Sequence, residues 1–131
     1  MNNRGKTFKS SWWSVEVPTG WTVKEDDACV TLSGARFASA LQISAARKDT
    51  GSVTDDELKE FARAQAPDEK MVGVNLPLWK GFYAEQVENG VFWKYWWLRA
   101  GNLMVYVTYN VDERFEEEAI VDSVLESLVP A

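Results

Sequence analysis

The sequence contains no histidine and only one cysteine, Cys29. The absence of histidine removes the usual general base at neutral pH, the Ser/His and Cys/His nucleophile systems and the commonest metal ligand. A single cysteine excludes a disulfide within the chain, and its position in the short apolar run ACVTLS predicts a small buried side chain. No phosphate-binding or dinucleotide-binding glycine motif occurs either. We therefore expect a protein that is not an enzyme and that holds neither a metal nor a cofactor.

Positive charge is also scarce, with 14 Lys and Arg against 20 Asp and Glu and a net charge of −6. Nucleic acids and anionic membranes attract basic patches, so this balance argues against both as partners. Acidity of this size favours solubility and also suits a basic partner protein. No apolar run is long enough for a membrane span, and no apolar segment follows the basic residues of 1–11. We expect no membrane insertion, no secretory signal and a cytoplasmic location.

What is present is the pattern of one α+β domain. The 131 residues suit a single domain over 1–131, in which we expect 1–11 to be a flexible N-terminal arm. Alternating apolar residues predict a mostly antiparallel sheet of seven to eight strands, and helical spacing predicts two main helices near 55–66 and 113–128. Thr54 and Glu57 form a capping box before the first helix, and Asp112 is the expected cap of the second. Helices on opposite faces of the sheet make an α/β/α sandwich.

Two short turns predict the register of the central strands. Asn89-Gly90 is the preferred type I′ pair, and Gly101-Asn102 fits a type II′ turn. With these turns at the hairpin tips, Glu85 lies opposite Lys94, which is a favourable pair of opposite charges.

This register gives the strands one aliphatic face, which suits the C-terminal helix, and one face rich in aromatic rings. Because aromatic rings and arginine are enriched at binding hot spots, the second face supplies the candidate partner-binding residues. They are Phe82, Trp93, Tyr95, Trp97, Arg99 and Tyr106. Two interpretations stay open. The first helix and the N-terminal strands cover these rings as a second layer of core, or part of the face is left open for a partner.

Several segments in order along the chain carry a resemblance. The segment VEVPTGWTVKEDD resembles the opening of domains of the PsbP-like superfamily. A small bacterial family of unknown function within that superfamily is similar in four further segments: SALQISAARKDTG, FWKYWWLRAGN, VYVTYN and VLESL. The resemblance implies an antiparallel sheet between helices and a mostly non-catalytic role. Members of the superfamily include a photosystem II subunit, a nuclear-import factor that binds a small GTPase, and chaperones of type VI secretion effectors.

Three functions are compatible with these observations. The first is a non-catalytic protein-binding module, of a chaperone or immunity type linked to a secretion system, which binds a hydrophobic client or a basic partner. The second is a small-molecule binding domain with an aromatic-lined cleft that holds several tryptophans and a polar group such as Arg99 or Gln86. The third, which the sequence favours least, is an enzyme with a pair of carboxylates, because the acidic clusters at 25–27, 55–57 and 116–118 fit turns and helix starts. The sequence leaves the oligomeric state open.

Overall fold

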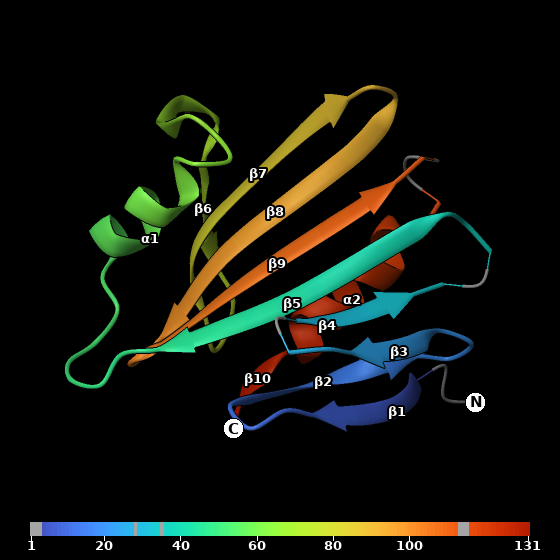
Figure 1. The fold of residues 1–131 in the computed structure, drawn as a ribbon, viewed down its shortest axis with the longest axis horizontal. Helices are drawn as coiled ribbons and strands as arrows, with labels where there is room; N and C mark the ends of the chain where they lie inside the picture. The colour runs from blue at the N-terminus through green and yellow to red at the C-terminus, as the bar shows by residue number, and fades with distance from the viewer. Residues whose placement is uncertain (1–3, 28, 35, 113–115) are drawn as a thin grey trace.

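The computed structural model describes residues 4–27, 29–34, 36–112 and 116–131, and the predicted α+β fold is confirmed (Figure 1). The larger sheet is antiparallel, with the strand order β3-β4-β5-β9-β8-β7-β6. Its strands are β3 (Thr22–Glu25), β4 (Val30–Ser33), β5 (Ser39–Arg47), β6 (Val72–Asn75), β7 (Lys80–Glu88), β8 (Val91–Ala100) and β9 (Leu103–Val111). The smaller sheet has the order β1-β2-β10 and contains β1 (Arg4–Lys9), β2 (Trp13–Pro18) and β10 (Val129–Pro130).

The two central hairpins pair as the turn residues predict. Asn89 and Gly90 both have positive φ, 53° and 79°, as a type I′ turn requires, and Gly101 has a φ of 59°. Glu85 lies opposite Lys94. The predicted separation of the strands into an aliphatic and an aromatic face is therefore confirmed.

The aliphatic face is covered by α2 (Glu118–Ser127), which lies behind the sheet in Figure 1, and by the smaller sheet. Trp79 fixes the chain between β6 and β7 to the end of α2, because its indole N–H donates to the carbonyl of Leu128 at 2.8 Å.

Two predictions about the N-terminus are wrong. Arg4–Lys9 forms strand β1 rather than a flexible arm, since Phe8 packs on Trp13 with ring centroids 5.7 Å apart. Residues 1–3 lie outside the described residues. The N-terminal strands β1 and β2 also lie on the aliphatic side and leave the aromatic face to α1.

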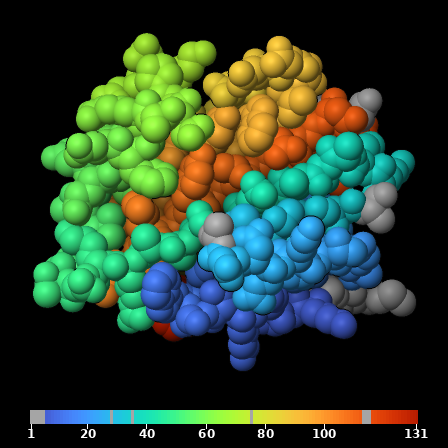
Figure 2. All heavy atoms as spheres, viewed as in Figure 1, coloured from blue at the N-terminus to red at the C-terminus, as the bar shows by residue number. Residues whose placement is uncertain are grey.

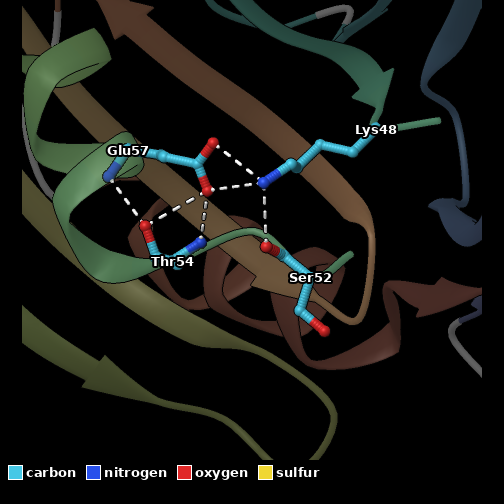
Figure 3. A network of polar contacts seen from close by, with 4 residues as sticks. All are labelled: Lys48, Ser52, Thr54 and Glu57. Carbon is cyan, nitrogen blue, oxygen red and sulfur yellow. Dashed lines mark hydrogen bonds and ion pairs between the residues drawn. The ribbon is translucent and has the colours of Figure 1, made fainter. Parts of the chain in front are cut away.

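Helix α1 (Asp55–Ala62) lies over the aromatic face, and its capping box is confirmed (Figure 3). Thr54 accepts a hydrogen bond from the backbone N–H of Glu57 at 3.2 Å, and the Glu57 carboxylate accepts from the backbone N–H of Thr54 at 2.9 Å. Lys48, at the end of β5, reaches both the same carboxylate and the carbonyl of Ser52. The helix is shorter than predicted, and a 3₁₀ turn, η1 (Asp68–Lys70), follows it.

The second helix begins later than predicted, and Asp112 is not its cap. The helix starts after Glu117, whose side chain is 3% exposed and accepts a hydrogen bond from the hydroxyl of Tyr109 at 2.7 Å. A tertiary hydrogen bond therefore sets the position where α2 begins, rather than a local capping residue. The predicted first turn at 113–115 lies outside the described residues. Next along the chain, Glu118 pairs with the buried Lys94 of β8 at 3.0 Å, which joins the helix to the sheet.

Candidate functional site

Helix α1 divides the aromatic face into a covered part and an open part. Only Leu58 and Ala62 of the helix are fully buried, so the helix covers a narrow strip of β7 and β8. Beneath it, Trp97 is 0% exposed. The Nζ of Lys59 lies 5.2 Å from the centre of the Phe82 ring, a cation–π contact that places Phe82 in the same covered part.

Arg99 belongs to this covered part as well. Its Nε donates to the Asp55 carboxylate at 2.6 Å, which ties the first turn of α1 to β8. This hydrogen bond is the main reason why the pKa of Asp55 lies below its usual range. The Arg99 side chain thus holds the helix and does not extend into the open part of the face.

The aromatic side chains form a row of nearly parallel rings. Along β8, the ring centres of Trp93 and Tyr95 lie 5.9 Å apart at an angle of 6°, and those of Tyr95 and Trp97 lie 5.7 Å apart at 14°. Tyr106 on β9 stacks on Trp97 at 5.9 Å, and Phe61 of α1 meets Tyr106 edge-on. Such stacking stabilises the row beyond the burial of area alone. The middle of the row, at Tyr95 and Trp97, is buried, while Trp93 at one end and Tyr106 at the other are partly exposed.

The open part of the face is a hollow of about 480 Å³. Figure 2 shows the orange atoms of β9 recessed between the green atoms of the α1 segment and the teal atoms of β5. The lining side chains come from β5, β7, β8 and β9, from the chain after α1 and from the turn between β3 and β4. They are Cys29, Gln42, Ser44, Gln65, Gln86, Glu88, Trp93, Tyr95, Tyr106 and Thr108.

Neutral polar groups surround the rings of the hollow. The Gln86 amide donates to the hydroxyl of Tyr95 at 2.7 Å, which holds the phenol in place. Burial is the main cause that raises the pKa of Tyr95, with the Glu88 carboxylate adding to it, while the Gln86 hydrogen bond opposes the rise. Burial raises the pKa of Tyr106 to about 12. Both phenols are therefore neutral at physiological pH, and of the described residues that line the hollow only Glu88 carries a charge.

Cys29 is not the buried side chain that the sequence predicts. It is partly exposed and lines the hollow, because it belongs to a tight turn in which its backbone N–H donates to the Asp26 carboxylate at 3.0 Å.

The structure thus separates the six candidate residues into two groups. Trp93, Tyr95 and Tyr106 line the hollow, whereas Phe82, Trp97 and Arg99 contact α1. The aromatic face is therefore covered in one part, by α1 and not by the N-terminal strands, and is open in the other part.

Sequence reasoning missed the polar residues that β5 contributes. Gln42 and Ser44 line the hollow because β5 pairs with β9, so that Ser44 lies opposite Tyr106 and Gln42 lies opposite Thr108. The alternation in SALQISAAR puts these polar side chains on one face, but the pairing of β5 with β9 spans about 60 residues and has no local signal.

A second hollow, of about 880 Å³, lies between β2 and α2 and holds none of the candidate residues. Ser127, one of its polar residues, is engaged within the fold: it accepts from the backbone N–H of Glu16 at 2.9 Å and donates to the carbonyl of Val124 at 2.7 Å. None of the described residues that line this hollow is aromatic. Although it is larger, it offers fewer groups for recognising a ligand than the hollow beside α1.

Two further features concern the described residues as a whole. No three His, Cys, Asp or Glu side chains in 4–27, 29–34, 36–112 and 116–131 are grouped as metal ligands. Within the same ranges, no helix combines the length and apolar character needed to cross a membrane.

Comparisons with known proteins support the fold alone. No protein-family model matches the chain, and no curated protein matches it. The fold is similar to a crystal structure from Bacteroides thetaiotaomicron VPI-5482, solved at 1.50 Å, with a TM-score of 0.79 and 19% sequence identity. The match covers 97% of this chain and 48% of the other, so this chain spans about half the length of that protein.

Proposed function

We propose that this chain is a non-catalytic binding domain that docks a segment of another protein in the hollow beside α1. The observation that carries the proposal is the exposure of both ends of the ring row. Trp93 and Tyr106 stay partly exposed in the hollow although the rest of the row is covered. Phe61, which is 44% exposed, extends this aromatic surface from the hollow onto α1.

The rim of the hollow suits a polypeptide segment. Three glutamine amides, at positions 42, 65 and 86, can each donate and accept hydrogen bonds, as the backbone of an extended segment requires. The rings supply apolar contact area of the kind that dominates binding hot spots. The absence of histidine from the sequence and the PsbP-like resemblance, whose members are mostly non-catalytic, also favour a binding role.

A wider biological role follows as part of the same proposal. The acidic net charge and the resemblance favour a partner-binding protein of the bacterial cytoplasm, of the chaperone or immunity type.

The test is a selection from a random displayed-peptide library on the wild-type chain. Ser44→Tyr fills the hollow from β5, and Ser52→Tyr makes the same change at an exposed position outside it. We expect the selected peptides to bind wild type and Ser52→Tyr alike and to lose affinity at least about tenfold for Ser44→Tyr. Both variants are first checked for wild-type circular dichroism and melting temperature. Peptides that bind a folded Ser44→Tyr as well as wild type contradict the proposal.

A small-molecule ligand is the second candidate, and one observation favours it. The volume of about 480 Å³ lies within the range of small-molecule sites, and Gln86 already orients the Tyr95 hydroxyl in it. A metabolite that quenches tryptophan fluorescence in wild type but not in Ser44→Tyr would support this candidate. The absence of any such response across a broad metabolite panel would count against it.

A further inference from the structure

The charges around the hollow indicate the sign of charge that its ligand carries. Among the described residues that line it there is one charged side chain, Glu88, and no lysine or arginine. The ion pairs formed within the described residues leave Glu88 out, and its carboxylate is close enough to raise the pKa of Tyr95. An anionic ligand would meet this carboxylate and a chain of net charge −6. A cationic ligand is attracted by both.

The rings favour the same sign of charge. An aromatic face is electron-rich and attracts a cation placed over it, most strongly when the ring is tryptophan. Trp93 is the last ring of the stacked row and is partly exposed in the hollow. A flat cation can therefore continue the row by stacking on Trp93, with Glu88 at the rim to neutralise its charge.

The hydrogen-bond acceptors at the rim of the hollow favour a guanidinium group over an ammonium group. A guanidinium group is planar, stacks on aromatic rings and presents five N–H donors in a fixed fork, whereas an ammonium group is a compact point charge. The Glu88 carboxylate and the side-chain oxygens of Gln42 and Thr108 are acceptors around the same hollow. The neutral tyrosine rings beside them offer apolar surface to the aliphatic stem of an arginine.

We infer that the hollow binds the guanidinium group of an arginine on a partner polypeptide, stacked on Trp93 and paired with Glu88. This inference rests on the proposed function and names the side chain that the docked segment places in the hollow. Charge complementarity carries it: among the described lining residues one carboxylate, which takes part in none of the ion pairs above, lies beside part-exposed rings in an acidic chain.

The experiment compares two capped pentapeptides, Gly-Gly-Arg-Gly-Gly and the same peptide with citrulline, which keeps the shape of arginine but has no charge. Binding is followed by the shift of the Trp93 indole N–H signal in NMR titrations. We expect the arginine peptide to bind about fivefold more tightly than the citrulline peptide at low salt. Raising the salt concentration to about 0.5 M should remove most of this difference.

Two substitutions locate the charge effect. Glu88→Gln should weaken the arginine peptide about threefold to fivefold and leave the citrulline peptide unchanged. Asp49→Asn removes the same charge at an exposed position that does not line the hollow, and it should change neither affinity. Trp93→Leu, for which binding is followed by the backbone amide signals of β8 and β9, should weaken both peptides, because both lose the ring on which they stack.

Several results would overturn the inference. Equal affinities of the two peptides, a Glu88→Gln effect no larger than that of Asp49→Asn, or no shift of the Trp93 signal with either peptide would each do so. If ethylguanidinium alone bound as tightly as the arginine peptide, the ligand of the hollow would be a small cation and not a protein segment. The proposed function is judged separately by the Ser44→Tyr selection. Selected peptides that depend on the hollow but contain no arginine would keep the function and overturn this inference.

Discussion

Trp93 and Trp97 lie four residues apart on the same face of β8, yet the structure assigns them opposite roles. Trp97 is 0% exposed beneath α1, and Trp93 is partly exposed in the hollow. Truncation of each to alanine therefore gives a matched comparison. We expect Trp97→Ala to lower the free energy of unfolding strongly, and Trp93→Ala to lower it only slightly.

The magnitudes follow from the surroundings of each ring. Truncation of a buried tryptophan to alanine costs about 3–5 kcal/mol. Among the described residues, the indole N–H of Trp97 has no hydrogen-bond acceptor, and removing this unsatisfied donor offsets about 1 kcal/mol of the loss. The lower end, about 3 kcal/mol, is therefore expected for Trp97→Ala. Trp93 borders solvent, so its truncation leaves no enclosed cavity and should cost about 1 kcal/mol.

Urea unfolding followed by far-UV circular dichroism measures both values without depending on tryptophan fluorescence. The midpoints are compared at a common m-value, since a change in m would indicate a change in the denatured or native state. Similar losses for the two variants, or a larger loss for Trp93→Ala, would refute the division of the ring row into a covered and an open part.

Three further predictions test other parts of the structure. Tyr109→Phe removes the donor to the buried Glu117 carboxylate and should cost about 1.5–3 kcal/mol in urea unfolding, and a loss below about 0.5 kcal/mol would contradict the importance of this bond. Gly81→Ala should lower stability by at least about 2 kcal/mol in the same assay, because Gly81 has a φ of 155° and an added Cβ would overlap a carbonyl oxygen of β8. Arg99 lowers the pKa of the Asp55 carboxyl in the folded chain, so the unfolded chain binds more protons at low pH. The stabilisation of α1 by this pair is therefore complete above about pH 4 and is lost as the pH falls further. Hydrogen exchange of the α1 amides, corrected for intrinsic rates, should speed up below that pH in wild type. The increase should be smaller in Asp55→Asn, in which the capping carboxylate of Glu57, whose pKa is also lowered, still titrates.

The parts of the fold that depend on local chemistry could be predicted from the sequence. Asn89-Gly90 and Gly101-Asn102 define their own turns, and a two-residue turn fixes the register of every pair behind it. The capping box at Thr54 is likewise a contact between residues three apart. These predictions are confirmed because the interactions responsible lie within a few residues of each other.

The errors concern contacts between one element and its neighbour in the fold, which the local pattern of residues does not reveal. Strand β1 has a weak apolar pattern and is held by pairing with β2 and by Phe8, so its sequence is also compatible with a flexible arm. The start of α2 depends on the hydrogen bond between Glu117 and Tyr109, which the local choice of Asp112 as a cap does not include.

The candidate site was predictable only as a face of the sheet. The register puts the six candidate residues on one face, but a thin helical stripe does not reveal which end of that face the helix will cover. The ion pair between Asp55 and Arg99 and the burial of Leu58 decide this, and both are tertiary contacts. The polar rim from β5 required the pairing with β9 in addition.

The central claim is that a partner occupies the hollow beside α1, which the two partly exposed ends of the ring row line. Its most direct test is the set of indole N–H signals of the seven tryptophans, recorded while a peptide selected on wild type is added. The structure predicts that the Trp93 signal shifts most, that Trp79 and Trp97 change little, and that Ser44→Tyr abolishes the shift. A selected peptide that leaves Trp93 unchanged, or that shifts it equally in the folded Ser44→Tyr variant, would contradict the claim.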